Sequence, residues 1–375
     1  MIKRILKEQL SSRIGKGKVI ILIGPRQVGK STLLREIQKE SSQPTLFINC
    51  DEPDMRLMLE NVTSTQLKAM IGNHRIVMID EAQKVFHIGD TLKLMADNIK
   101  DVQIIATGSS SFELSNKINE PLTGRKFEFN MYPISIKELV LQHGKTEEQR
   151  LLERRIIYGL YPDIVNNPGN EQEYLLELTN SYLFKDILAF QNIRKPEILN
   201  KLLTGLALQL GQEVSYNELS QLIGVDKGTV EKYIELLEKC FVVFRLSSFS
   251  RNLRNELKRT RKIFFYDNGV RNAILNNFAP LALRQDVGAL WENFMISERV
   301  KQNSYSRDFR KIYFWRTQTQ QEIDLLEEKD GVLYAYEFKW NPKRQAKIPG
   351  SFVEAYPNHR FEVITSENYI GFLTN

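Results

Sequence analysis

The stretch "ILIGPRQVGKST", residues 21–32, joins an apolar run to a glycine-framed loop that ends in Lys-Ser-Thr. The loop fits the pattern G-x-x-x-x-G-K-[ST], in which glycines let backbone N–H groups surround phosphate oxygens, the lysine reaches the β- and γ-phosphates, and the hydroxyl holds Mg²⁺. The apolar residues before the loop predict a buried strand, and "STLLREIQKE" predicts a helix whose N-terminus adds its dipole to the phosphate site. The residues expected to bind a nucleotide are Gly24, Gly29, Lys30, Ser31 and Thr32.

Further apolar runs follow the loop at the spacing typical of a parallel sheet, with helix-like stretches such as "PDMRLMLE" and "TLKLMADNI" between them. The runs are residues 45–49, 75–83, 102–110 and 125–133. This alternation predicts an α/β fold, a doubly wound and mainly parallel sheet with its ligand at the C-terminal ends of the strands.

Polar residues end two of these runs. Asp80 is placed to hold Mg²⁺ through a bound water, and Glu81 to orient and deprotonate an attacking water; the alternative is a helix N-cap by Asp80. The next run ends in Thr107, Ser109 and Ser110, which either touch the γ-phosphate or the water, or belong to a turn. A strand between the loop strand and the Asp80 strand is what the ATP-hydrolysing branch of P-loop proteins uses.

Two arginines have alternative interpretations. Arg125, which follows Gly124 in "PLTGRKFEF", could stabilise transition-state charge at the γ-phosphate, in its own chain or in a neighbouring one. It could equally form an ion pair at the edge of a strand. Arg26, inside the loop, suits either a ligand contact or a partner surface.

After about residue 135 the pattern becomes helical, which predicts a lid over the nucleotide or a connector between domains at residues 136–205. Residues 213–246 predict a helix-turn-helix followed by a β-like wing. If this segment binds double-stranded DNA, Asp226, Lys227 and Thr229 meet the groove; the alternative is a protein-interaction module.

A basic run, "SRNLRNELKRTRK", follows the helix-turn-helix directly. Such a run is usually a solvated surface, but beside a helix-turn-helix it is the best candidate for phosphate contacts. Its charged residues are Arg251, Arg254, Lys258, Arg259, Arg261 and Lys262, against Glu256.

The last hundred residues carry a second group of polar side chains. Glu292 lies in a helix-like stretch, Asp324 in "QEIDLLEE", and Glu337 and Lys339 in the strand-like "VLYAYEFKW". Alternation along that strand puts Glu337 and Lys339 on one face. The D…E-x-K pattern is that of the restriction-endonuclease-like fold, in which the acids bind Mg²⁺ and the lysine stabilises charge or positions water. An ion pair without catalysis is the alternative.

The order of "GPRQVGKST", "VMIDEAQ", "IIATGSSS", "LTGRKFEFNMYPIS", "YGLYPDIV", "KIFFYDNGVRNAI" and "EIDLL…YEFKW" resembles that of prokaryotic AAA-type ATPases with a C-terminal winged-helix and nuclease-like part. The resemblance spans nearly the whole chain and implies a Mg-ATP site, with Arg125 in the "GR" position. It implies a P-loop core, a helical lid or connector, a winged helix-turn-helix and a restriction-endonuclease-like domain. The expected ranges are 1–135, 136–205, 206–270 and 271–375.

Composition limits the remaining possibilities. The 375 residues carry a formal charge of +6, which permits an anionic partner without establishing one. Two cysteines far apart in sequence and four scattered histidines do not point to a disulfide framework or to a thiolate or histidine metal site. With no apolar run long enough to span a bilayer and no signal peptide, we expect a cytoplasmic protein without a membrane partner.

Two classes of function compete. One is an ATPase that acts on DNA, with cleavage as an optional output, and the other is a nucleotide-controlled protein-interaction switch; either is compatible with a homo-oligomer. A metabolic kinase is disfavoured because over half of the chain lies in domains without an evident small-molecule motif.

Overall fold

The computed structural model describes residues 2–109, 118, 122–183, 196–250 and 261–374. The chain forms two compact units. The first is Met1–Pro133 with Lys239–Phe241, and the second is Ile134–Glu238 with Val242–Asn375. The boundary after Pro133 lies close to the one expected after residue 135. The three further ranges expected from the sequence fall within the second unit except for Lys239–Phe241, and their identity as separate domains stays a prediction.

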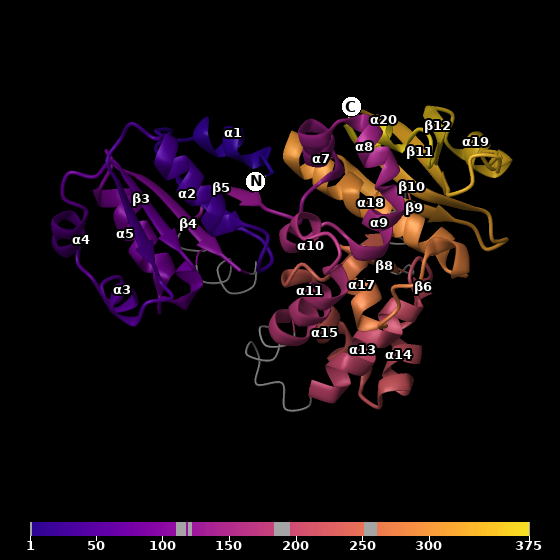
Figure 1. The fold of residues 1–375 in the computed structure, drawn as a ribbon, viewed down its shortest axis with the longest axis horizontal. Helices are drawn as coiled ribbons and strands as arrows, with labels where there is room; N and C mark the ends of the chain where they lie inside the picture. Colours follow the sequence, from indigo (N-terminus) through magenta and orange to yellow (C-terminus); the bar gives the residue numbers. More distant parts are fainter. Residues whose placement is uncertain (1, 110–117, 119–121, 184–195, 251–260, 375) are drawn as a thin grey trace. The chain divides into compact units, whose positions relative to one another are not determined.

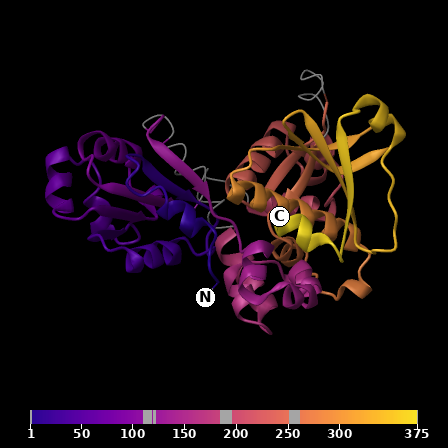
Figure 2. The same cartoon turned by 90° about the horizontal axis from the view of Figure 1, so that it is seen from above.

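The first unit is built on a five-stranded parallel sheet with the order β2-β3-β4-β1-β5. Helices flank the sheet, as Figures 1 and 2 show. The strands are β1 (Val19–Ile23), β2 (Thr45–Asn49), β3 (Ile76–Asp80), β4 (Gln103–Gly108) and β5 (Lys126–Asn130). The helices are α1 (Leu6–Ser11), α2 (Lys30–Glu40), α3 (Pro53–Leu57), α4 (Ser64–Ile71) and α5 (Ile88–Asn98), with a 3₁₀ turn at Ala82–Lys84. The predicted doubly wound α/β fold is confirmed.

The central strands of this sheet are buried along their whole length and mostly apolar, because both of their faces are covered. Every residue of β1, β3 and β4 is buried. Such strands need helices on both sides, which the intervening segments supply. β4 lies between β1 and β3, so the C-terminal ends of these three strands meet at one edge of the sheet. The segments that follow them therefore come together there.

The second unit contains two sheets. A three-stranded antiparallel sheet has the order β6-β8-β7, and a mixed four-stranded sheet has the order β12-β11-β10-β9, in which only β11 and β12 are parallel. The strands are β6 (Glu213–Val214), β7 (Val243–Ser247), β8 (Arg261–Phe265), β9 (Lys311–Arg316), β10 (Glu322–Lys329), β11 (Val332–Lys339) and β12 (His359–Thr365). A bridge between Ser248 and Phe314 links the two sheets.

Helices cover both sheets of the second unit. The 20-residue helix α18 (Val287–Ser306) packs against β11 and β8. The other helices are α7 (Ile136–His143), α8 (Lys145–Arg150), α9 (Leu152–Tyr158), α10 (Pro162–Asn166), α11 (Glu171–Glu177), α13 (Pro196–Leu208), α14 (Tyr216–Ile223), α15 (Lys227–Lys239), α17 (Asn268–Ile274), α19 (Gly350–Ala355) and α20 (Tyr369–Thr374), with a π-helix at Leu178–Leu183 and a 3₁₀ turn at Leu281–Leu283. In the ranges that the structure describes, the helices are too short or too polar to cross a bilayer.

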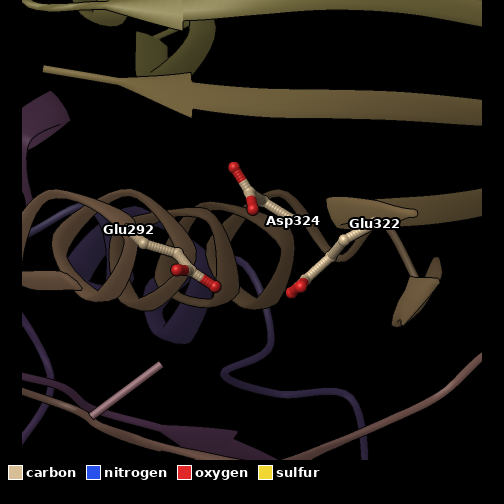
Figure 3. A group of neighbouring side chains, drawn as sticks. All are labelled: Glu292, Glu322 and Asp324. Carbon is tan, nitrogen blue, oxygen red and sulfur yellow. The ribbon is translucent and has the colours of Figure 1, made fainter. Parts of the chain in front are cut away.

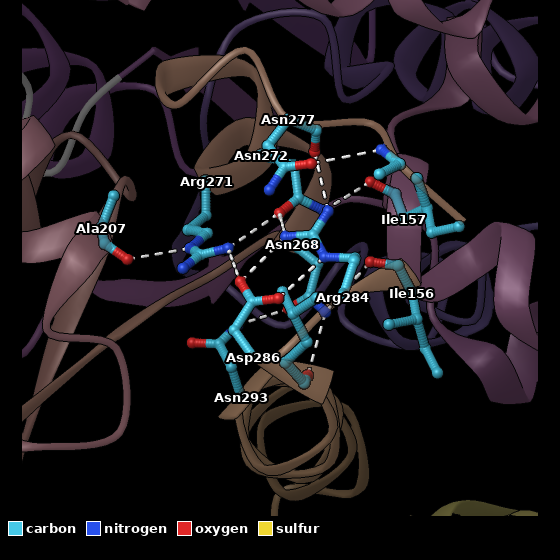
Figure 4. Close-up of polar contacts among 12 residues, drawn as sticks. Ile156, Ile157, Ala207, Asn268, Arg271, Asn272, Asn277, Arg284, Asp286 and Asn293 are labelled. Atoms are coloured by element: carbon cyan, nitrogen blue, oxygen red, sulfur yellow. Dashed lines mark hydrogen bonds and ion pairs between the residues drawn. The ribbon is translucent and has the colours of Figure 1, made fainter. Parts of the chain in front are cut away.

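A buried polar network joins helices of the second unit that lie far apart in sequence (Figure 4). Arg271 donates to the carbonyl of Ala207 at 2.9 Å and to Asp286 at 2.6 Å. The Asn268 amide donates to the carbonyls of Ile156 at 3.1 Å and of Leu290 at 3.0 Å. Because buried polar groups are costly unless paired, these bonds hold α9, α13, α17 and α18 in one arrangement.

Candidate functional site

Two glycines determine the shape of the loop between β1 and α2. A Cβ atom on Gly24 would lie 2.1 Å from the carbonyl oxygen of Met131, so only glycine fits there. Gly29 has a φ of 93°, a left-handed conformation that glycine adopts without steric cost. It is the N-cap of α2, and no side chain from the described residues caps the helix. The first N–H groups of α2 therefore point toward the loop as an anion-binding helix end does.

The lysine of the loop is buried within it. The Lys30 side chain donates from Nζ to the carbonyls of Gly24 at 2.9 Å and Pro25 at 2.8 Å. The residue is 5% exposed. A phosphate group in the loop would compete with these carbonyls for the same donors, so the ammonium is already positioned for an anion. Arg4 also stabilises the loop, because its guanidinium donates to the carbonyl of Val28 at 2.6 Å.

Thr107 joins the two acidic residues at the end of β3 to the end of β4. Its hydroxyl donates to Asp80 Oδ1 at 2.5 Å and accepts from the backbone N–H of Glu81 at 3.1 Å. Thr107 is fully buried. Glu81 has a left-handed backbone, with a φ of 54°, which costs a non-glycine residue on the order of 1 kcal/mol. The threonine therefore sets the direction of Asp80 and anchors the strained residue after it.

Gln83 makes a second link between β3 and β4, which the sequence did not predict. Its amide nitrogen donates to Glu81 Oε2 at 2.6 Å and to Ser109 Oγ at 3.0 Å. Both Gln83 and Ser109 are almost completely buried. The available signal was a polar residue in "DEAQK", two residues after Glu81. Ser110, which was predicted with Ser109, lies outside the described residues.

The second group of side chains lies between α18 and the mixed sheet (Figure 3). Oxygens of Glu292, Glu322 and Asp324 all lie within 4.8 Å of one another. Lys339 Nζ lies 2.6 Å from Glu337 Oε2 and 3.8 Å from Asp324 Oδ2. We call Glu292, Glu322, Asp324 and Glu337 the acidic cluster.

The structure thus brings together the four residues predicted from the sequence, which are Glu292, Asp324, Glu337 and Lys339. It adds Glu322, which sequence reasoning missed. Glu322 is two residues before Asp324 on the same strand, and the strand period of two could have indicated it.

Burial and mutual repulsion perturb the pKa values of the acidic cluster. Burial is the largest cause that raises the pKa of Glu292 to about 8, and Lys262 opposes it. Burial and then the charge of Asp324 raise the pKa of Glu337 to about 7. Burial also raises the pKa of Asp324. Burial and mutual repulsion therefore favour the protonated forms of these carboxyl groups, and the neighbouring ammonium groups of Lys262 and Lys339 oppose this.

Lys262 is not the phosphate contact that the basic run predicted. Its Nζ lies 2.9 Å from Glu292 Oε1 and also pairs with Glu322. The residue is 2% exposed. Although burial alone would lower the pKa of Lys262, these carboxylates outweigh burial and raise it. The prediction was wrong because Lys262 lies on β8, whose side chains face the interior.

Of the rest of the basic run, Arg261 lies 3.9 Å from Glu231. The remaining predicted phosphate contacts lie outside the described residues. These are Arg251, Arg254, Lys258 and Arg259.

Comparison with protein families agrees with the architecture of the first unit. Residues 16–140 match a family described as "AAA domain". These residues form an AAA-type P-loop domain. Residues 149–281 and 287–372 match two families, each described as a domain of unknown function (DUF8612 and DUF4143). The AAA domain thus carries the whole P-loop region, and the acidic cluster lies within the last of the three matches.

Several curated proteins are similar along most of the chain. "Uncharacterized protein Rv2008c" of Mycobacterium tuberculosis is 27% identical over 346 residues, covering 90% of this chain and 74% of that protein. "Uncharacterized protein MJ1544" of Methanocaldococcus jannaschii is 22% identical over 372 residues, covering 92% of this chain and 80% of that protein.

Solved structures with a partial likeness include the Thermotoga maritima RuvB Holliday junction branch migration motor. It is 16% identical, covers 68% of this chain and 93% of that chain, and gives a TM-score of 0.32. The Aeropyrum pernix ORC1 protein in complex with DNA is 13% identical, covers 72% and 90% respectively, and gives a TM-score of 0.34.

The residues of the AAA domain suit a nucleotide with Mg²⁺. The loop offers an ammonium and an uncapped helix N-terminus for phosphates, and no room for a larger residue at Gly24. Ser31 in the first turn of α2 and Asp80 at the end of β3 offer a hydroxyl and a carboxylate, which are hard oxygen ligands. Thr32, which follows Ser31, is exposed.

Arg125 lies at the N-terminal ends of the strands, whereas the P-loop of its own chain lies at their C-terminal ends. It precedes β5, whose first residue, Lys126, pairs with Val19 at the start of β1, whereas the loop follows the end of β1. The five residues of β1 span roughly 16 Å between these two ends of the sheet. Arg125 Nε pairs with Asp97 at 2.7 Å on the surface. Of the two interpretations that give it a role in hydrolysis, only the one in a neighbouring chain agrees with this position.

The start of α15 is held by its own polar residues. Asp226 accepts from the backbone N–H of Thr229 at 3.0 Å and from its hydroxyl at 2.6 Å. The hydrogen bond from that hydroxyl is the main cause that lowers the pKa of Asp226. Asp226 and Thr229 thus cap the helix, and Lys227 between them is exposed.

Proposed function

We propose that the AAA domain binds and hydrolyses ATP with Mg²⁺. The observation that carries this proposal is the meeting of three features at one edge of the sheet: the P-loop with buried Lys30, the acidic pair after β3, and the hydroxyls that end β4. A P-loop alone would support binding. The acidic pair, fixed by Thr107, adds a carboxylate placed to activate water.

Each residue has a proposed role in this reaction. Lys30 and the first N–H groups of α2 bind the β- and γ-phosphates. Ser31 and Asp80 hold Mg²⁺, which when bound offsets the negative charge of the phosphates. Glu81 accepts a proton from water as the water oxygen bonds to the γ-phosphorus and the bond to the departing ADP oxygen breaks.

The hydroxyls of Thr107 and Ser109 keep the water and the γ-phosphate in place. Arg125 of a second copy supplies positive charge to the transition state, which requires a homo-oligomer.

We further propose that hydrolysis drives DNA binding or remodelling by residues 134–375. Two features support this. The helices α14 and α15 with the β6-β8-β7 sheet suit a winged helix, and the acidic cluster with Lys339 suits a nuclease-like site for Mg²⁺. The range 136–205 would then be the lid.

A second candidate is a nucleotide-controlled switch that binds a protein and has a nuclease-like domain without activity. Lys262 favours it, because a buried ammonium already pairs with two members of the acidic cluster and opposes the entry of a metal ion.

The test is steady-state Mg-ATP hydrolysis with and without double-stranded DNA at low and moderate salt. Salt-sensitive stimulation by DNA supports the DNA-acting ATPase, since phosphate contacts weaken steeply with salt. Turnover that does not respond to DNA favours the protein switch.

Lys30→Ala should lose nucleotide binding, and Glu81→Gln should bind ATP without turning it over. Equal hydrolysis by wild type and Glu81→Gln would reject the proposed base.

Cleavage is tested separately. If the acidic cluster cuts DNA, Lys339→Ala should lose nuclease activity and retain ATP hydrolysis. Loss of ATPase activity in this variant with the fold intact would contradict the independence of the two chemistries.

A further inference from the structure

Gln83 lies between the proposed base and the end of the neighbouring strand. Its amide nitrogen is 2.6 Å from Glu81 Oε2 and 3.0 Å from Ser109 Oγ. A carboxamide has two N–H donors, so both bonds can form at once. Gln83 is 3% exposed and Ser109 is 5% exposed, so water competes little for these donors. The buried Gln83 amide therefore links the Glu81 carboxylate, just after β3, to the Ser109 hydroxyl, just after β4.

The local backbone makes this contact possible. Residues two apart in a helix or 3₁₀ turn do not face each other. Glu81, however, lies directly before the 3₁₀ turn at Ala82–Lys84 and has a φ of 54°. The chain therefore changes direction at this residue. The N–H of Glu81 is held by Thr107 at 3.1 Å. The strained conformation thus returns the Gln83 side chain to the Glu81 carboxylate.

The bond matters because Glu81 is only partly buried and has a long side chain. The Thr107 contact fixes its backbone and leaves its side-chain torsions free. A short hydrogen bond from a neutral donor to a carboxylate is stronger than one between neutral groups and removes much of that freedom. With Oε2 occupied by Gln83, the other carboxylate oxygen is left to accept from water.

We propose that Gln83 is a positioning residue for hydrolysis, which holds the Glu81 carboxylate in line with the end of β4. This inference rests on the proposed ATPase function. Because Gln83 would act through the Glu81 carboxylate, which it contacts at 2.6 Å, its loss should slow turnover and spare nucleotide binding. Ser109 accepts from the same amide nitrogen, so its hydroxyl influences Glu81 through Gln83.

The test compares Gln83→Met and Gln83→Glu with wild type. Methionine keeps the length of the side chain and lacks the donors. Glutamate keeps the shape and places a second carboxylate beside Glu81. We expect kcat to fall about 10- to 100-fold in Gln83→Met and further in Gln83→Glu, with KM for ATP and the Kd for Mg-ADP within about twofold of wild type.

Gln43→Met is the matched control, because Gln43 is exposed in the turn before β2. It should turn over like wild type. Adding Gln83→Met to Glu81→Gln should change nothing further, because a positioning residue has no effect without the group it positions.

The outcomes separate this inference from the proposed function. Wild-type turnover that Glu81→Gln abolishes supports the ATPase whatever Gln83 does. The positioning role is overturned if kcat in both Gln83 variants stays within about twofold of wild type, or if their KM rises while kcat holds. Nucleotide binding by Gln83→Glu shows that the domain is folded, should Gln83→Met fail to fold.

Discussion

Gly24 shows how a single position can determine the use of a loop. Its backbone lies so close to the chain after β5 that any side chain would meet the carbonyl of Met131. The glycine pattern in the sequence is explained by phosphate binding, and the structure adds a packing reason for the same residue. Loop shape and contact with β5 therefore depend on one another.

Gly24→Ala should weaken nucleotide binding by at least about tenfold and lower the free energy of unfolding by about 1–3 kcal/mol, because the backbone must move to admit a methyl group. Titration with a fluorescent ATP analogue and urea unfolding measure the two effects. Gly350→Ala is the control, because a Cβ there meets open space at the start of α19. Normal binding by Gly24→Ala would show that the loop adapts.

Asp286 should make the second unit sensitive to acid. Burial alone would raise its pKa, but hydrogen bonds from Arg284 and Arg271 lower it to about 2. A lowered pKa stabilises the fold above the ordinary value of 3.8, and this contribution disappears as pH falls toward 2.

Asp286→Asn should therefore cost about 2 kcal/mol at neutral pH and flatten the loss of stability below about pH 4. Urea unfolding at a series of pH values measures this, with the exposed Asp101→Asn as control. An unchanged slope in Asp286→Asn would assign the acid sensitivity to other carboxylates.

Among the elements, strand β8 decides the character of the acidic cluster. It pairs with β6 and β7 in one sheet and packs against α18, which supplies Glu292. This position turns Lys262 inward, toward Glu292 of the helix and Glu322 of β10. The acidic cluster and Lys262 thus come from four elements, and the residues predicted for this site lie on three of them, α18, β10 and β11.

Lys262→Met should lower the free energy of unfolding of the second unit by about 3–5 kcal/mol, because it leaves buried carboxylates without their cation. Lys262→Arg keeps the charge and should lose less. Adding Glu322→Gln to Lys262→Met should recover part of the loss, which a double-mutant cycle in urea measures. Additive effects would mean that the two side chains do not interact in solution.

On the scale of the whole molecule, the chain contains two units with separate cores. The P-loop belongs to the first, and the acidic cluster with the network around Arg271 belongs to the second. Separate cores allow separate unfolding.

Calorimetry should therefore resolve two transitions, and Mg-ADP should raise the midpoint of only one. At a hundred times its Kd, a ligand stabilises the unit that binds it by about 2.7 kcal/mol. Hydrogen exchange would assign that transition to the strands β1 to β5. Lys30→Ala should remove the shift. A common shift of both transitions would mean that the units unfold together.

Features that depend on residues close together in the chain could be predicted from the sequence. These include the P-loop, the strands of the first sheet, the α/β class, and the identity of most polar residues at both sites. Local spacing suffices for them because a strand or a helix start follows from its own periodicity and neighbours.

Which side chains meet could be seen only once the elements were packed together. The basic run made Lys262 a candidate for phosphate contacts, but its strand packs against α18 and the side chain is buried. The sequence left Arg125 equally open to a role at the γ-phosphate and to an ion pair, and the register of β5 with β1 places it at the N-terminal ends of the strands, where it pairs with Asp97. The bond between Gln83 and Glu81 forms where Glu81 has a left-handed backbone, a conformation that the sequence pattern did not predict. Direction and partner are set by packing between elements, which one-dimensional spacing does not contain.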